Sequence, residues 1–211
     1  MKMLKKAAAV LLAAAMSLTM LTACGGGSGS GTAATSGTYT MKTTVVEVNG
    51  VAPTKTETVY ETTNGTWFYS ESTYGTEVHA SLSNAKGEHY TINPTTKKAY
   101  KESESEASGS NKDDIAEPNA TITTSTGTWK YNDKTYTTEE MTIVYPGADG
   151  YKVVVARCYD GAQLAYIKSV TTSAEGTYTE IERVLEYSKT ADESKLNPNN
   201  YELVEKREDL F

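Results

Sequence analysis

The chain has 211 residues and a formal net charge of −7, with 38% hydrophobic and 22% charged residues. An acidic protein is repelled by nucleic acids and by anionic lipid headgroups. The charge balance therefore argues against a nucleic-acid partner and against purely electrostatic attachment to a membrane.

The first 24 residues have the arrangement of a bacterial export signal. A positive head with Lys2, Lys5 and Lys6 precedes residues 7–21, which carry no charge. This apolar run is shorter than the roughly 20 residues of a transmembrane helix and fits the h-region of a signal peptide. Leu21-Thr22-Ala23-Cys24 then resembles the bacterial lipobox. The resemblance implies cleavage of residues 1–23 and a lipid on Cys24; the alternative is an ordinary secretory peptide with an incidental cysteine.

Residues 24–37 follow the cleavage site and consist almost entirely of Gly, Ser, Thr and Ala. Such a segment has no apolar face and is typical of a flexible tether. Its Cys-Gly-Gly-Gly-Ser start resembles lipoproteins of Gram-positive bacteria. The diacylglyceryl cysteine that the lipobox implies carries two chains, which suffice for stable anchoring. We therefore expect a protein held at the cell membrane, on the extracytoplasmic side, of a Gram-positive bacterium.

Residues 38–211 have the length of a single domain and the composition of β-strands, with Val, Tyr and Thr prominent. Turn pairs such as Asn49-Gly50 and Asp160-Gly161 recur, and we interpret Gly127 as another turn. This rhythm predicts a mainly β domain, an antiparallel meander or barrel. The expected strands are Tyr39–Val48, Thr56–Thr62, Thr66–Ser72, Val78–Ser83, His89–Ile92, Lys98–Lys101, Thr128–Tyr131, Lys134–Tyr145, Tyr151–Tyr159, Gln163–Thr172, Tyr178–Tyr187 and Tyr201–Val204.

Two segments depart from this rhythm. Residues 102–118 are rich in Glu, Ser, Asp and Asn, with Ile115 as their one large apolar residue. They cannot bury a face, so we expect a mobile acidic loop. Thr190 and Glu193 fit a capping box, and Pro198 would end the helix. A short helix is therefore predicted between Thr190 and Asn197.

Cys158 has no intramolecular partner once Cys24 carries a lipid. It lies in the apolar run Val153–Tyr159, where Arg157 is the one neighbour that could lower the pKa of its thiol. A reactive thiol is one interpretation. A small buried hydrophobic residue is the simpler one.

The C-terminal half contains a succession of motifs that resembles LolA/LppX-like lipoproteins and lipoprotein carriers. The motifs are Trp129 and Tyr131, Asp133-Lys134-Thr135-Tyr136, Thr142–Tyr145, Tyr159–Leu164, Ile181–Tyr187 and Leu196–Tyr201. The resemblance implies a curved antiparallel half-barrel whose concave face receives acyl chains beneath covering helices. This sequence departs from the pattern, because no amphipathic helix precedes Tyr39 and residues 102–118 have no apolar face.

The sequence offers little for catalysis or metal binding. His79 and His89, with Glu77 and Glu88, could meet across a hairpin, but zinc ligands usually come in closer pairs. Surface histidines are the simpler interpretation. No nucleophile triad, phosphate-binding loop or metalloprotease motif is present. We expect a non-enzymatic domain without catalytic residues, metal or cofactor.

One stretch suggests a binding face. Alternation along Tyr151, Val153, Val155, Arg157 and Tyr159 places a mostly apolar set on a single side of a strand. The predicted lining of a concavity for a lipid or another hydrophobic ligand is Trp129, Tyr151, Val153, Val155 and Tyr159. The alternative is an envelope scaffold or protein-interaction domain without a small ligand. The expected partners are thus the membrane, through Cys24, and either a hydrophobic ligand or an envelope protein; the sequence leaves the oligomeric state open.

Overall fold

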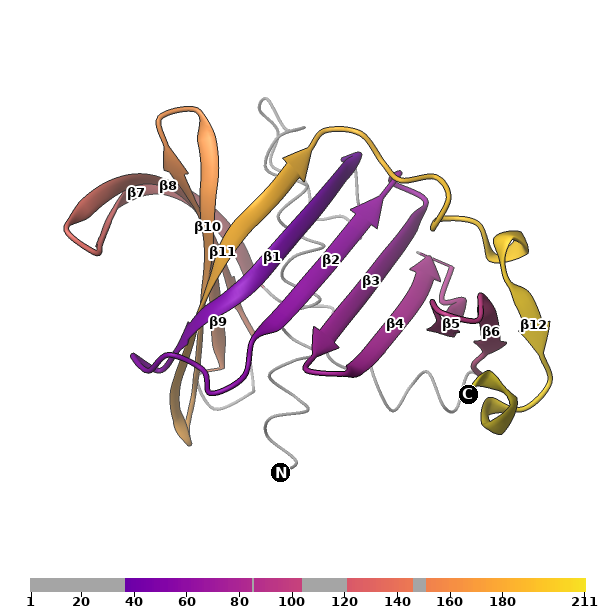
Figure 1. Ribbon diagram of the computed structural model, residues 1–211. Coiled ribbons are helices and arrows are strands. Elements are labelled where there is room, and N and C mark those ends of the chain that lie inside the picture. Colours follow the sequence, from indigo (N-terminus) through magenta and orange to yellow (C-terminus); the bar gives the residue numbers. More distant parts are fainter. Residues whose placement is uncertain (1–36, 85, 104–120, 146–150) are drawn as a thin grey trace.

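A computed structural model of the chain describes residues 37–84, 86–103, 121–145 and 151–211. These form one twelve-stranded sheet with two 3-10 helices (Figure 1). The predicted signal peptide and most of the predicted tether, residues 1–36, lie outside the described residues. The strands are β1 (Tyr39–Val48), β2 (Glu57–Thr63), β3 (Trp67–Tyr74), β4 (Glu77–Asn84), β5 (His89–Asn93), β6 (Lys98–Lys101), β7 (Thr121–Tyr131), β8 (Lys134–Val144), β9 (Lys152–Asp160), β10 (Gln163–Ser173), β11 (Gly176–Ser188) and β12 (Glu202–Val204). The helices are η3 (Pro198–Asn200) and η4 (Arg207–Leu210).

Two antiparallel meanders, β1–β6 and β7–β11, make up most of the sheet. Pairing of β1 with β11 joins them, and β12 adds to β6 in parallel. Tight turns close the hairpins as predicted: Asn132 and Asp133, between β7 and β8, have φ of 49° and 61°, as a type I′ turn requires. The predicted antiparallel, mainly β fold is confirmed, with one parallel pair added.

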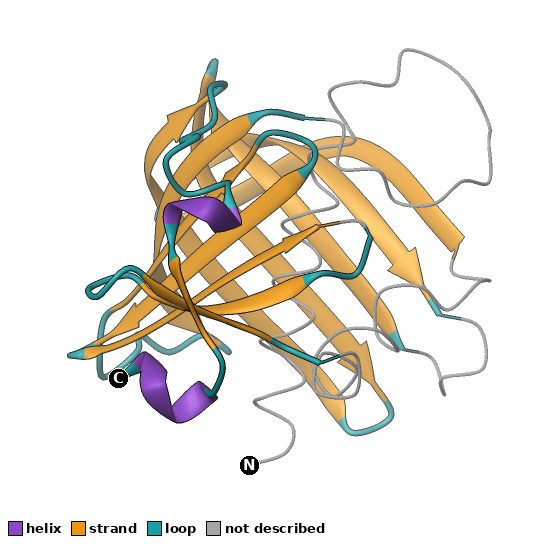
Figure 2. Cartoon of the chain, turned by 90° about the vertical axis from the view of Figure 1, so that its right-hand side faces the viewer, coloured by secondary structure: helices purple, strands orange, loops and turns teal. Residues whose placement is uncertain are grey.

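The sheet is strongly curved. Its margins turn away from the viewer in Figure 1, and Figure 2 shows the strands curling into an open barrel. Register shifts between β1 and β11 and between β9 and β10 mark β-bulges, which increase local twist and bend a sheet. We call the concave side the inner face and the convex side the outer face. The register places Met41, Glu61 and Val155 on the inner face, and Lys42 and Tyr60 on the outer face.

The C-terminal segment, residues 189–211 after β11, covers part of the outer face. Leu196 is buried there against an apolar cluster from β3–β6, with Ala191 and Tyr201 packed around it. The strand members of this cluster are Tyr69, Ala80, Leu82, Tyr90, Ile92 and Ala99. At the far end of the segment, η4 buries Leu210 and contacts β6 and β12.

The helix predicted between Thr190 and Asn197 does not form. Tertiary hydrogen bonds hold the segment in turns instead: the Asp192 amide donates to Thr62 Oγ1, and Tyr60 Oη donates to the Asp192 carboxylate. Pro198 begins a helix, η3, rather than ending one, as its fixed φ and missing N–H allow. None of the helices in the described residues is long and apolar enough to cross a membrane.

The acidic segment differs from prediction at its first residue. Glu102, expected in the loop, lies beside His89, the first residue of β5. Its carboxylate accepts a hydrogen bond from Thr91 and lies 3.1 Å from His89 Nδ1. The His89 contact and the Thr91 hydrogen bond hold the pKa of Glu102 down at about 2 despite partial burial. Residues 104–118 of the predicted loop lie outside the described residues.

Gly127 and Cys158 both lie within strands. Gly127 was predicted to be a turn but lies within β7, where a Cβ would come within 3.2 Å of Thr138 Oγ1. Cys158 is fully buried, and burial raises the pKa of its thiol to about 12. The interpretation of Cys158 as a small buried hydrophobic residue is confirmed.

Candidate functional site on the inner face

An apolar cluster occupies the inner face from β8 across to β1 and β3. Its centre is β9, where Val153 and Val155 are 0% and 1% exposed. Every member lies on a strand or next to one, so the lining is built from alternating side chains of one sheet face. The buried members are Tyr39, Met41, Phe68, Met141, Ile143, Tyr145, Val153, Val155, Leu164 and Ile167, with Tyr151, Tyr159 and Val184 packed against them.

Four of the five predicted lining residues come together in this cluster: Tyr151, Val153, Val155 and Tyr159. Their period-two spacing along β9 produces the shared face. Trp129 does not join them and lies on the outer face, opposite Tyr136 in the β7–β8 hairpin. The two-residue turn fixes this pairing, so grouping Trp129 with the concave lining was wrong.

Two carboxylates lie on the same inner face close to β1: Glu61 is buried and Glu182 is half-buried. Glu61 on β2 accepts a hydrogen bond from Tyr39 Oη at 3.4 Å, and Glu182 on β11 accepts one from Thr43 Oγ1. Burial, with the repulsion between them, raises the pKa of Glu61 to about 8; burial raises that of Glu182 to about 7. Sequence reasoning missed both, because a Glu in a Thr-rich strand reads as solvent-facing.

A second polar group borders the apolar lining on β8 and β9. Arg157 is buried and lies opposite Glu139, whose carboxylate accepts a hydrogen bond of 2.8 Å from Tyr159 Oη. Burial, followed by this hydrogen bond, raises the pKa of Tyr159 to about 12. The inner face thus combines an apolar lining with polar side chains that largely hydrogen-bond one another.

The hypothetical metal site is not assembled. Glu88 pairs with Lys101 and accepts from Asn84, while His89 faces Glu102. Among the residues that the structure describes, no group of three or more His, Cys, Asp or Glu side chains is placed to hold a metal ion.

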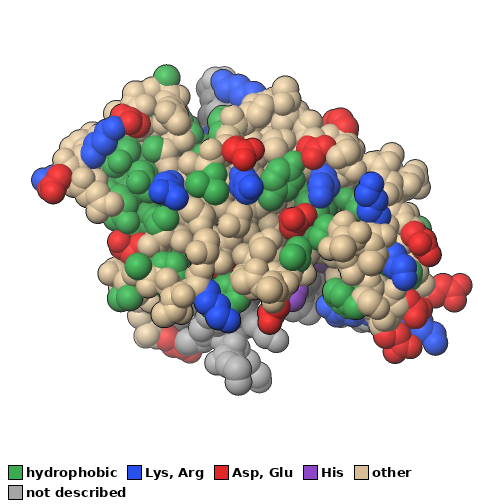
Figure 3. Space-filling model, viewed as in Figure 1, with side chains coloured by type: hydrophobic (Ala, Val, Ile, Leu, Met, Phe, Trp, Pro, Cys, Tyr) green, Lys and Arg blue, Asp and Glu red, His purple; other side chains and the backbone are tan. Residues whose placement is uncertain are grey.

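The outer face carries an aromatic cluster that sequence reasoning did not anticipate. Trp129 stacks on Tyr131 with ring centroids 4.7 Å apart, Tyr166 packs edge-on against both rings, and Tyr136 packs at a tilt against Trp129. Lys168 Nζ lies 5.6 Å from the Trp129 ring centroid. In Figure 3 a group of hydrophobic side chains is visible over this part of the sheet. The sequence could have indicated part of this cluster, because the Asn132–Asp133 turn fixes the β7–β8 register and so sets Trp129 opposite Tyr136.

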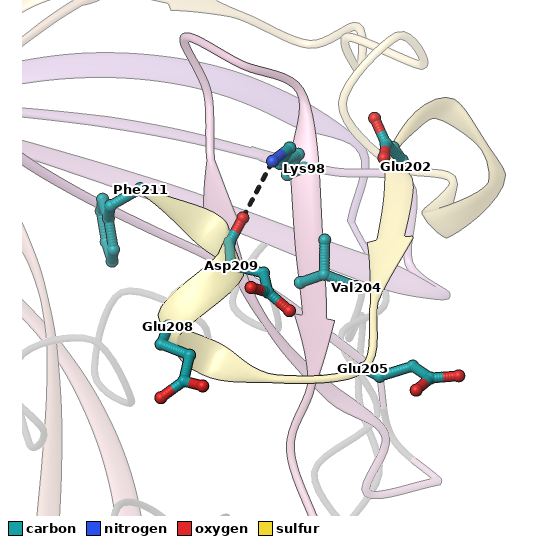
Figure 4. A pocket seen from close by; sticks show the side chains of 7 residues that line it. All are labelled: Lys98, Glu202, Val204, Glu205, Glu208, Asp209 and Phe211. Carbon is teal, nitrogen blue, oxygen red and sulfur yellow. Dashed lines mark hydrogen bonds between the residues drawn. The ribbon is translucent and has the colours of Figure 1, made fainter.

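A surface depression lies beside β12 and η4 at the opposite margin (Figure 4). Lys98 crosses it and donates to the Asp209 carbonyl at 2.9 Å. Its other lining residues are Val204, Phe211 and the acidic side chains of Glu202, Glu205, Glu208 and Asp209. Ligand pockets are predominantly apolar, so this acidic surface is a poor match for a hydrophobic ligand.

Comparisons with known proteins give distant structural matches. No protein-family model matches the chain, and no curated protein sequence matches it. A lipoprotein-sorting protein domain from Vibrio parahaemolyticus is 13% identical, covering 77% of this chain and 90% of its own, with a TM-score of 0.32. A LolA superfamily protein from Nitrosomonas europaea is 12% identical, covering 77% and 91%, with a TM-score of 0.33. A DUF1329 family protein from Desulfovibrio piger is 9% identical, covering 74% and 85%, with a TM-score of 0.30. These similarities assign no ligand or activity to this chain.

Proposed function

We propose that this protein is a lipid-anchored, extracytoplasmic lipoprotein whose inner face takes up the apolar part of a lipid or a similar ligand. The observation that carries the proposal is the apolar lining around Val153 and Val155, gathered on the concave side of the sheet. The C-terminal segment packs its apolar residues on the outer face instead. Concave sites with apolar walls and a few polar groups are the usual form of small-molecule sites.

The energetics set the expected affinity. Each buried methylene contributes about 0.8 kcal/mol, so ten of them offer roughly 8 kcal/mol. Association costs lie between about 4 and 15 kcal/mol. The two carboxylates near β1 also limit how much of the inner face is apolar. Little of this free energy remains after the association cost, so binding should be weak, micromolar at best.

Binding should depend on Val155 and not on its neighbour Val154. Val155 lies on the inner face within the lining, whereas Val154 lies on the outer face of the same strand. Titration of the purified protein with a fluorescent fatty acid should saturate for wild type and for Val154→Phe. Val155→Phe fills space in the lining without adding charge, so it should weaken binding at least tenfold.

Circular dichroism of both variants verifies that the sheet is retained. If neither wild type nor Val154→Phe gives saturable binding, or if Val155→Phe binds as tightly as wild type, the inner face is not the ligand site.

Anchoring should depend on Cys24, the residue on which the lipobox resemblance rests. Cells expressing the wild-type chain and fed radioactive palmitate should yield a labelled protein in the membrane fraction. Cys24→Ser should carry no label and should either remain uncleaved or be released. Cys158→Ser removes the other cysteine, which is buried, and should keep the label. Equal labelling of wild type and Cys24→Ser would show that the lipid is not attached there.

A further inference from the structure

β7 forms one margin of the sheet and pairs, among the described strands, with β8 alone. All eight of its residues from Thr121 to Thr128 are exposed. The opposite margin is β12, which is three residues long and is followed by Glu205 and Lys206. Short, charged edge strands discourage pairing with other chains, whereas β7 is 11 residues long and its one charged residue, Lys130, lies next to the hairpin turn.

The hairpin turn fixes which backbone groups of β7 point away from the sheet. Tyr131 and Lys134 flank the two-residue turn and exchange both backbone hydrogen bonds. Residues at even spacing from Tyr131 therefore bond to β8, and the alternate residues direct their N–H and C=O groups outward. These outward residues are Ile122, Thr124, Thr126, Thr128 and, next to the turn, Lys130, and the β7–β8 register runs without a bulge along all of them.

The side chains along this edge do nothing to block a partner strand. Residues 121–129 contain no charged residue and no proline, and Lys130 is the first charge. Thr and Ser predominate, with Ile122 at 53% exposure the one large aliphatic side chain. An edge of this length without charge, proline or bulge is a template for a further strand.

We propose that β7 pairs antiparallel with β7 of a second copy of this chain, about a two-fold axis at Ser125. This register joins the outward groups of both copies and sets Thr124 opposite Thr126 and Ile122 opposite Thr128 of the other copy. Trp129 then lies opposite Thr121, next to Val144, which is 40% exposed.

Charge and side-chain size favour a second copy as the occupant. The chain as a whole is acidic, so two copies repel each other over most of their surfaces. The β7 edge is neutral, and Thr–Thr pairs across strands are favourable. Recognition of a different peptide by strand addition relies on pockets for alternate side chains. The small, uniform Thr and Ser side chains of β7 fit a matching strand of the same composition.

Paired charge variants test this register in the full chain. Thr124→Lys with Thr126→Lys sets lysines opposite lysines in both symmetry-related pairs. Like charges opposite each other are destabilising, and a lost 1.4 kcal/mol corresponds to a tenfold change. Sedimentation equilibrium in detergent should show a concentration-dependent dimer for wild type and roughly tenfold weaker dimerisation for this variant. Thr124→Lys with Thr126→Glu sets opposite charges in the same pairs and should restore the dimer.

Cysteine cross-linking tests the two-fold axis directly. Ser125 would face its own copy at a non-hydrogen-bonded position, where Cα atoms lie about 4.5 Å apart, within disulfide range. Ser125→Cys should form a disulfide-linked dimer on mild oxidation. Thr123→Cys, on the same strand and face, should not, and the wild-type chain gives the background from its own cysteines.

A wild-type chain that stays monomeric, equal dimerisation of both charge variants, or cross-linking at position 123 rather than 125 would each overturn the proposal. So would a Ser125→Cys adduct with a protein of another size, because the edge would then serve a different partner.

Discussion

The free energy of unfolding should fall as the pH rises from about 4.5 to 8, the reverse of the usual behaviour of carboxylates. Unfolded Glu titrates near 4.5, whereas Glu61 and Glu182 in the folded sheet have pKa values of about 8 and 7. Between these values the folded state binds more protons than the unfolded state, so raising the pH destabilises it. One pKa unit corresponds to about 1.4 kcal/mol, so we expect a loss of several kcal/mol, shared between two coupled groups.

Replacing Glu61 or Glu182 by glutamine should remove that residue's share of the fall in stability with rising pH. Glu61→Gln and Glu182→Gln keep the shape of the protonated side chain, so each should match wild type near pH 4.5. Each should exceed wild type by roughly 2–4 kcal/mol above pH 8. Glu186→Gln, an exposed residue on the same strand as Glu182, is the control and should follow the wild-type curve. Urea unfolding at several pH values measures this, and parallel curves for wild type and Glu61→Gln would contradict it.

Below about pH 4.5, stability should change with pH in the opposite direction and fall as the pH falls. The pKa of Glu102 is held at about 2 by the neighbouring His89 and Thr91. Its stabilisation is present above pH 4.5 and is lost as the pH falls towards 2. The two effects together place the pH of greatest stability on the acid side of neutrality.

Leu196→Ala should cost about 2–5 kcal/mol of stability, the usual range for truncating a fully buried leucine. Leu196 is 1% exposed, and it is the one buried apolar side chain that the C-terminal segment contributes to the outer cluster of β3–β6. Its loss leaves a cavity against Tyr69 and Leu82 and weakens the attachment of the whole segment.

Leu203→Ala supplies the matched control, since Leu203 on β12 is 57% exposed and should change stability by less than about 0.5 kcal/mol. Urea unfolding compares the two. Equal, small effects would mean that the segment is not held through Leu196.

Local turn chemistry made most strands predictable. Glycine- and asparagine-based turns bound β1, β8, β9 and β10 at or within a residue of the predicted ends. The first seven residues of β7 were missed, because a strand exposed on both faces has no alternation of apolar and polar residues. The pairing of β1 with β11 was also invisible, since it joins residues far apart in the chain and depends on no local signal.

The candidate site was predictable where one strand determines it. The alternation along β9 alone brings Tyr151, Val153, Val155 and Tyr159 to one face. Trp129 was misassigned because its position relative to β9 depends on two registers, β7 with β8 and β8 with β9. The sequence indicates only the first of these, through the turn between β7 and β8. The burial of Glu61 and the partial burial of Glu182 arise from non-local pairing around β1, which composition does not indicate.

The β1–β11 pairing has a consequence for how the chain folds as it is synthesised. β1 emerges first, yet its second neighbour lies more than a hundred residues later. Until β11 arrives, the β1–β6 meander presents an open edge at β1, and the register of the whole sheet is set only when the two halves meet. Such distant contacts slow folding and prolong exposure to misassociation. This protein should therefore fold slowly and keep the β1 edge open to misassociation until β11 pairs with it.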